Sequence, residues 1–300
     1  MKLDFVEEGQ GSAVLLIHST VAGNKQWRKL IEYLSPQYRI LAPNLFGYGS
    51  TIKWNKKRSQ TLSDQVDLLR SFFDQNESIS IVGHSFGGSV AMMAAKKYPE
   101  KIKKLVLIEP NPFYLLKNHS DPDSYQEVLN IRDIIKANTF KETWGQAAKQ
   151  FADYWNGSGA WKKMDELRRE KFAEALKPNF HEFDCVINET TSLEEWRDIL
   201  PSSTHILFSE KTVNSIRKIV TIFEKTMPNW TFHSYSEGTH MAPLTHPSVV
   251  NPIIHKILKE LKLVQRRLSP KCLAINAKTA KLTPVITIQI NSESQNPVTL

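Results

Sequence analysis

The distribution of apolar residues predicts alternating strands and helices over the first part of the chain. Apolar runs with little polar alternation, typical of strands, occupy residues 3–9, 13–19, 38–45, 78–83 and 103–110. Apolar residues recur at helical spacing over residues 24–34, 61–75 and 86–98. Strands that are apolar on both faces are typical of a parallel sheet covered by helices. The pattern therefore predicts an open, mostly parallel, doubly wound α/β sheet.

The strand–helix rhythm stops between residues 112 and 195, where aromatic-rich helical segments replace it. It resumes with strands predicted over 203–210 and 230–236 and helices predicted over 213–226 and 248–263. We therefore expect an α/β core formed by residues 1–111 and 196–265, interrupted by a helical cap over residues 112–195. Residues 266–300, with a β-rich piece at 284–290 and a polar end, are expected to be a loosely ordered tail.

The segment Gly83-His84-Ser85-Phe86-Gly87 is a GxSxG motif between a predicted strand and a predicted helix. Glycines on both sides let the strand and helix backbones approach closely, and the tight turn holds the serine side chain out at the carboxyl edge of the sheet. The Phe86 N–H lies at the start of the helix, where free N–H groups favour a developing negative charge. Ser85 is therefore predicted to be a nucleophile.

A serine nucleophile needs a base, because its hydroxyl reacts weakly at neutral pH. His240 follows the last predicted strand, in a loop that contains Gly238, and is the preferred base. His246, which precedes Pro247 and the final predicted helix, is the alternative.

These segments resemble the α/β-hydrolase-fold superfamily of lipases, esterases and carbon–carbon hydrolases. The resemblance covers about residues 3–263 and rests on four segments, LLIHST (15–20), APNLFGYGST (42–51), GHSFGG (83–88) and GTHMAPLTHP (238–247). It implies an α/β-hydrolase fold with an inserted helical cap. It also implies that Ser85 and His240 are catalytic and that the backbone N–H groups of Phe86 and Thr20 form the oxyanion hole.

Three positions depart from the family pattern. Ser19 follows His18 where the family usually has glycine, and Asn44 replaces the usual aspartate of the APNLFGYG segment. Thr212 stands at the usual position of the catalytic aspartate and cannot carry a charge. Without an acid, the imidazolium formed during catalysis would lack its partner.

Some relatives take the catalytic acid from the end of the strand that follows the nucleophile. In this chain that strand ends with Glu109, which we predict as the acid. Glu210 lies close to the usual turn and is an alternative, and a chain with no working acid is another.

Composition narrows the remaining classes. The N-terminus carries charges where a signal peptide needs an apolar segment, and no apolar run is long enough to span a membrane. We therefore expect a cytoplasmic protein that does not associate with a membrane. The net charge is +8, but six basic residues and one acidic residue lie in 261–300 alone. We therefore expect no nucleic-acid partner. Cys185 and Cys272 have no ligand spacing, so no metal or other cofactor is implied.

We therefore predict a serine hydrolase with a small-molecule substrate, a small or medium carboxylic ester cleaved through an acyl-enzyme intermediate. A carbon–carbon hydrolase, a thioesterase or a lactonase would use the same Ser-His-Glu residues, and a non-catalytic ligand-binding protein on the same scaffold is the alternative from another class. Trp144, Trp155 and Trp161 are the candidates for substrate binding. The sequence does not set the oligomeric state.

Overall fold

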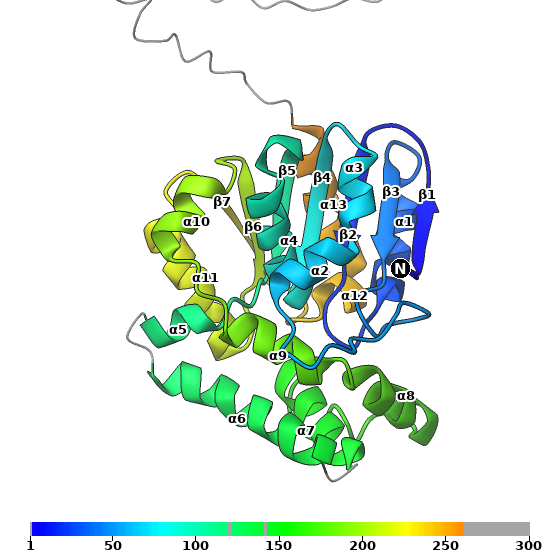
Figure 1. Cartoon of the computed structure of the whole chain (residues 1–300), viewed down its shortest axis with the longest axis vertical. Helices are drawn as coiled ribbons and strands as arrows, with labels where there is room; N and C mark the ends of the chain where they lie inside the picture. The colour runs from blue at the N-terminus through cyan, green and yellow to red at the C-terminus, as the bar shows by residue number, and fades with distance from the viewer. Residues whose placement is uncertain (1, 119–121, 141–142, 261–300) are drawn as a thin grey trace, which may run out of the picture. The chain divides into compact units, whose positions relative to one another are not determined.

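The computed structural model describes residues 2–118, 122–140 and 143–260, and its centre is a seven-stranded sheet (Figure 1). The strands are β1 (Phe5–Glu8), β2 (Ala13–Ile17), β3 (Arg39–Pro43), β4 (Ile79–His84), β5 (Ile102–Ile108), β6 (Thr204–Ser209) and β7 (Thr231–Tyr235). Their order across the sheet is β1-β3-β2-β4-β5-β6-β7. Every neighbouring pair is parallel except β1 and β3, so the predicted mostly parallel sheet is confirmed.

The described helices alternate with the strands in the order that the sequence predicted. Those of the core are α1 (Arg28–Leu34), α2 (Leu62–Leu68), α3 (Arg70–Asp74), α4 (Phe86–Lys97), α11 (Asn214–Thr226), α12 (Ala242–Thr245) and α13 (Pro247–Lys259). Short 3₁₀ turns occupy Asn24–Trp27 and Pro99–Lys101. Between β5 and β6 lie α5 (Tyr114–Asn118), α6 (Pro122–Phe140), α7 (Trp144–Asn156), α8 (Glu166–Leu176), α9 (Asn179–Ile187) and α10 (Leu193–Ile199).

Successive residues of the central strands feed two separate apolar layers. Val14 and Leu16 of β2 belong to the layer that holds α1 and α13. Leu15 and Ile17 belong to the layer that holds α2, α3, α4 and α11. Because side chains alternate across a strand, a strand between two helical layers must be apolar at every position. All five residues of β2 are buried, which explains why its sequence shows no alternation.

The expectation of a strand buried on both faces is wrong for β1. All four of its residues are exposed, and it pairs antiparallel with β3 at the edge of the sheet. Glu7 can therefore keep its carboxylate at the surface, where it accepts a hydrogen bond from Arg39 Nε at 2.7 Å. An edge strand needs no apolar cover on its outer side, so charged residues fit there.

Two predicted helices differ in detail from the observed ones. The helix predicted over 61–75 is interrupted at Leu69, which separates α2 from α3, and the one predicted over 24–34 begins as a 3₁₀ turn. Thr61 caps the start of α2, because its hydroxyl accepts the Asp64 N–H while the Asp64 carboxylate accepts the Thr61 N–H.

Helices α5 to α10 form one insertion between two neighbouring strands, which we call the insertion. Figure 1 shows α6, α7, α8 and α9 together beyond the ends of the strands. The sequence-based extent of residues 112–195 stays a proposal, and its boundary at 195 falls within α10. The tail predicted over 266–300 lies outside the described residues, as does the end of the helix predicted over 248–263. Within the described ranges, no helix combines the length and the apolar character needed to cross a membrane.

Asn44, one of the three positions that depart from the family pattern, is part of a polar network with Asp4. Asn44 Nδ2 donates to Asp4 Oδ2 at 2.9 Å, and Asn44 Oδ1 accepts the Asn24 N–H at 2.8 Å. Asp4 Oδ2 also accepts the Ser50 N–H at 3.0 Å, and these two hydrogen bonds lower the pKa of Asp4. The Asn44 amide in the loop after β3 therefore faces one carboxylate, that of Asp4, which lies just before β1.

We expect Asn44→Asp to lower the free energy of unfolding by about 1–3 kcal/mol, because it replaces a donor with a second carboxylate beside Asp4. Adding Asp4→Asn should recover part of the loss, since one amide and one carboxylate face each other again. Urea denaturation of the two single variants and the double variant measures this. Additive losses would contradict the pairing.

Candidate active site

Ser85 occupies a strained turn between β4 and α4. Its backbone has φ 55° and ψ −118°, a region that non-glycine residues rarely adopt. A Cβ on Gly83 would lie 2.3 Å from the Gly87 carbonyl oxygen, and a Cβ on Gly87 would lie 2.3 Å from the Ile17 carbonyl oxygen. Both flanking positions must therefore be glycine for the turn to pack against its neighbours, which is the close approach that the sequence predicted.

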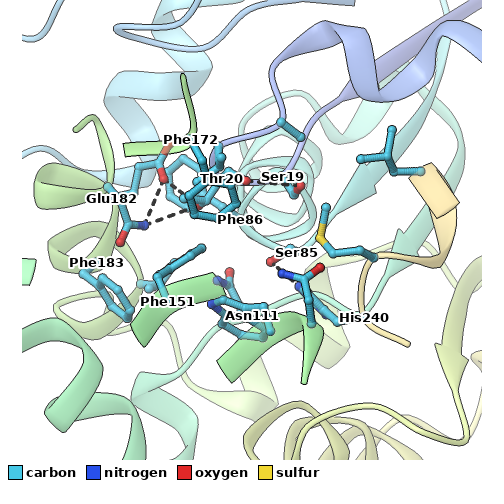
Figure 2. Close-up of a pocket in the computed structure, with 18 of the residues that line it drawn as sticks. Ser19, Thr20, Ser85, Phe86, Asn111, Phe151, Phe172, Glu182, Phe183 and His240 are labelled. Carbon is cyan, nitrogen blue, oxygen red and sulfur yellow. Dashed lines mark hydrogen bonds between the residues drawn. The ribbon is translucent and has the colours of Figure 1, made fainter. Parts of the chain in front are cut away.

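His240 lies between Ser85 and Glu109 and is within hydrogen-bonding distance of both. Its Nε2 is 3.0 Å from Ser85 Oγ, and its Nδ1 is 2.5 Å from Glu109 Oε2. Because a carboxylate only accepts, Nδ1 carries the proton and Nε2 is free to accept the Ser85 hydroxyl proton. The three predicted catalytic residues, far apart in sequence, thus form one hydrogen-bonded chain (Figure 2 shows Ser85 and His240).

Glu109 is fully buried at the end of β5, in a backbone conformation with φ 44°. Its carboxylate has two supports besides His240. The Ser209 N–H donates to Oε1 at 2.7 Å, and the Thr212 hydroxyl donates to Oε2 at 2.7 Å. A buried carboxylate is costly unless hydrogen bonds satisfy it, and these bonds do so at both oxygens.

Thr212, the position of the missing aspartate, therefore contacts the carboxylate that lies beside His240. The alternative acid, Glu210, is exposed, and its Oε1 accepts a hydrogen bond from Ser234 Oγ at 3.2 Å. The alternative base, His246, precedes α13, and its Nδ1 lies 2.8 Å from Thr245 Oγ1. The structure brings neither alternative into the hydrogen-bonded chain of Ser85.

The peptide between Ser19 and Thr20 is oriented by His18. His18 Nε2 accepts the Leu45 N–H at 3.0 Å, which leaves Nδ1 to donate to the Ser19 carbonyl oxygen at 2.8 Å. Burial lowers the pKa of His18 to about 4, so the ring is neutral at pH 7, as this pattern requires. In a trans peptide the C=O and N–H point in opposite directions. The Thr20 N–H is therefore turned away from His18.

Ser19, which replaces the usual glycine, has a polar partner of its own. Its hydroxyl donates to Gln26 Oε1 at 2.6 Å, and its backbone N–H lies 3.2 Å from the same oxygen. The side chain is therefore accommodated without a change at the next peptide. On the other side of Ser85, Phe86 is the first residue of α4, where helical N–H groups lack intrahelical acceptors.

A cavity of about 220 Å³ opens next to these groups. Ser85, His240, Phe86 and Thr20 line it from the core (Figure 2). The insertion supplies most of the remaining wall, which is largely apolar and includes Phe113, Phe151, Trp155, Met164, Phe172, Phe183 and Val186. A concave, mostly apolar pocket with a few convergent polar groups is typical of a small-molecule site.

Comparison with known proteins supports the same fold. The model of the α/β-hydrolase fold matches residues 12–158. A pimeloyl-[acyl-carrier protein] methyl ester esterase from Legionella pneumophila is 22% identical over 261 residues, which covers 86% of this chain and 100% of that protein. A thermophilic esterase from Thermogutta terrifontis has a TM-score of 0.67 at 21% identity, covering 85% of this chain and 92% of that one. The chain has the α/β-hydrolase fold.

A further relative matches a smaller part of this α/β-hydrolase. A cis-3-alkyl-4-alkyloxetan-2-one decarboxylase from Shewanella oneidensis is 31% identical over 118 residues, which is 38% of this chain and 37% of that protein. The relatives thus include different chemistries on one fold. The reaction of this α/β-hydrolase has to be argued from its own site.

The three tryptophans predicted to bind substrate are placed differently in the hydrolase. Trp155 lines the cavity, and its ring centroid is 4.3 Å from that of His240. Trp144 and Trp161 do not line it. Both are partly buried against the apolar core. The rings of Trp161 and Phe172 pack edge to face, with 6.2 Å between their centroids. Aromatic content alone did not separate cavity walls from the packing behind them.

Sequence reasoning missed two polar residues of the hydrolase's cavity, Asn179 and Glu182 of α9. Both are buried, and Glu182 Oε2 accepts a hydrogen bond from the Thr20 hydroxyl at 2.5 Å. The one sequence signal for them was Glu182, a charged residue between Phe180 and Phe183 in a helical segment. In the described ranges of the chain, no group of three or more His, Cys, Asp or Glu side chains could hold a metal ion.

Thr212→Asp should lower the free energy of unfolding of the hydrolase by about 3 kcal/mol, because it sets a second carboxylate against buried Glu109. Combining it with Glu109→Gln should restore most of the loss, since one carboxylate and one amide then face each other. Urea denaturation of both variants tests the coupling. Equal midpoints for Thr212→Asp and the double variant would show that the two side chains do not interact.

Proposed function

We propose that this protein is a serine hydrolase that cleaves small or medium carboxylic esters through an acyl-enzyme intermediate. The observation that carries the proposal is the chain of hydrogen bonds from Ser85 Oγ through His240 to the Glu109 carboxylate. Nucleophile, base and orienting acid in this arrangement are what serine acyl transfer requires. The similarity to esterases supports the same reaction class.

In the first step Ser85 Oγ attacks the carbonyl carbon of the ester while His240 Nε2 takes the hydroxyl proton. The Nδ1–H of His240 stays hydrogen-bonded to Glu109, which stabilises the positive imidazolium and fixes the ring orientation. The tetrahedral intermediate then collapses, and His240 gives its proton to the departing alcohol. Water, with His240 again as the base, releases the acid from Ser85.

The negative oxygen of the tetrahedral intermediate needs donors that point into the cavity. We assign this role to the backbone N–H groups of Phe86 and Thr20, both of which belong to residues beside Ser85 in the cavity wall. Phe86 adds the positive end of the α4 dipole. His18 supports the second donor, because it holds the Ser19 carbonyl oxygen on the opposite side of the peptide.

The cavity argues for a substrate of modest size. Its volume of about 220 Å³ lies below the range typical of pockets that bind drug-sized ligands. The wall that the insertion contributes is mostly apolar. A non-catalytic binding protein was attractive because Thr212 cannot be a catalytic acid. The contact between Glu109 and His240 weakens that argument, since it supplies a carboxylate from β5.

Hydrolysis of p-nitrophenyl esters from acetate to decanoate should be measurable, with an optimum at short or medium acyl chains because of the cavity size. Ser85→Ala should remove the activity, since no nucleophile remains. Initial rates of the two proteins side by side test this. Equal rates would contradict the assignment of Ser85.

Glu109→Gln should lower kcat by about a thousandfold to ten-thousandfold, because an amide cannot stabilise the imidazolium and can hold the wrong tautomer. Glu210→Gln, which makes the same chemical change at an exposed residue outside the hydrogen-bonded chain of His240, should stay within about twofold of wild type. Steady-state kinetics on the best ester compares them. If both variants kept wild-type kcat, Glu109 would not be the catalytic acid.

A further inference from the structure

The cavity contains a second buried carboxyl group that the proposed reaction does not use. Glu182 is 1% exposed, and its Oε2 accepts hydrogen bonds from Thr20 Oγ1 at 2.5 Å and Asn179 Nδ2 at 3.1 Å. In Figure 2, Glu182 and His240 lie on opposite sides of the view, with Thr20 and Phe86 between them. Glu182 therefore faces the cavity from the insertion, away from the reacting serine.

Two acceptor atoms at this end of the cavity have no partner. Glu182 Oε1 and Asn179 Oδ1 are both buried, and neither has a hydrogen-bond partner in the part of the chain that the structure describes. The Asn179 amide is oriented by its Nδ2, which points to Glu182 Oε2 and lies 3.4 Å from Thr20 Oγ1. In this orientation Asn179 Oδ1 points away from both partners of Nδ2 and accepts no hydrogen bond from the described residues. Buried polar atoms without partners are rare and call for an explanation.

The charge of Glu182 is not neutralised by a neighbouring side chain. Among the described residues it makes no salt bridge, whereas the nearby Asp184 on the same helix pairs with Lys136 Nζ at 2.8 Å. Burial raises the pKa of Glu182, while the polar side chains of Thr20, Asn179 and Tyr48 around its carboxyl group act in the opposite direction. An isolated carboxyl in an apolar cavity is stabilised by any ligand group that donates a hydrogen to it.

We propose that Glu182 and Asn179 form a substrate-recognition subsite for a hydrogen-bond donor, a hydroxyl or an amino group carried by the ester. Glu182 Oε1 and Asn179 Oδ1 are both acceptors. A donor group of the substrate can hydrogen-bond to them, whereas an alkyl group of the substrate leaves them buried and unpaired. The inference rests on the proposed ester hydrolysis for its kinetic consequences. The binding preference does not depend on turnover.

This subsite gives the cavity a way to select among esters of the same size. A site built to hydrogen-bond a substrate group discriminates strongly against the analogue that lacks it, because its own polar atoms are then unpaired. The apolar walls alone distinguish esters only by volume and chain length. A donor group near Glu182 therefore sets which small ester is preferred.

The kinetic test compares methyl hexanoate with donor-bearing esters. These are methyl 3-hydroxyhexanoate, methyl 6-hydroxyhexanoate, methyl 6-aminohexanoate and 2-hydroxyethyl hexanoate. The rate of hydrolysis is measured as the rate at which carboxylic acid is released. We expect at least one donor-bearing ester to have a kcat/KM about tenfold or more above that of methyl hexanoate. The ester with the highest kcat/KM shows whether the preferred donor is a hydroxyl or an amino group. It also shows whether the donor belongs to the acyl or the alcohol part of the substrate.

Glu182→Gln should reduce this preference to about twofold or less, because it keeps the volume but turns a free acceptor into a donor. Asp184→Asn is the matched control, since it also removes a carboxylate from α9 but at a residue that pairs with Lys136 outside the cavity wall. It should keep the wild-type preference. An equal loss on all esters in Glu182→Gln would overturn the proposal, because it would mean that Glu182 acts only by holding Thr20. A wild type without preference for any donor-bearing ester would overturn it too.

A binding measurement separates this inference from the proposed function. Calorimetry on Ser85→Ala with hexanamide, 6-hydroxyhexanamide and 6-aminohexanamide needs no turnover. Tighter binding of a donor-bearing amide, lost on adding Glu182→Gln, supports the subsite even if the wild type hydrolyses no ester. Active hydrolysis with equal binding of all three amides, and equal rates on all esters, leaves the serine hydrolase standing and removes the subsite.

Discussion

The buried hydrogen bond between Glu109 and His240 is the interaction on which the site depends. It requires the carboxylate to stay where water cannot solvate it, and the sheet makes this possible. Glu109 directly follows β5, its support from Ser209 comes from β6, and His240 follows β7. Ser85 follows β4, so the groups that meet at the site come from four strands that are adjacent in the sheet. The parallel register of these strands is thus what converts distant residues into one contact chain.

Each departure from the family pattern is matched by a polar partner close to it. Thr212 donates to the Glu109 carboxylate, Ser19 donates to Gln26, and Asn44 donates to Asp4. In the first and third cases a charge is carried by a different residue while the local hydrogen bonds remain complete. At Thr212 and Asn44 the carboxylate of a neighbouring residue, Glu109 or Asp4, therefore accepts the hydrogen bond of the uncharged side chain. Such exchanges keep buried polar groups satisfied, which is the condition that the interior enforces.

The sequence was sufficient for features that depend on local geometry. The glycines around Ser85 reveal a close approach of backbones, and the end of an apolar strand marks Glu109 as a residue at the carboxyl edge. Features that depend on distant segments were out of reach. The contact of Thr212 with Glu109 needs the pairing of β5 with β6, and the exposure of β1 needs its place at the edge of the sheet. Trp155 could not be separated from Trp144, because only the packing of the insertion decides which ring faces the cavity.

The contact between Thr20 and Glu182 links substrate recognition to the chemistry of the core. Thr20 belongs to the loop after β2, whereas Glu182 belongs to α9 of the insertion, and a 2.5 Å hydrogen bond joins them. If the Thr20 N–H stabilises the oxyanion, any group that binds Glu182 also acts on the position of that donor. Binding energy from a remote part of the substrate can then be used at the reacting carbonyl, where it raises kcat rather than only lowering KM. Changes at Glu182 should accordingly alter specificity and rate together, since this side chain serves both.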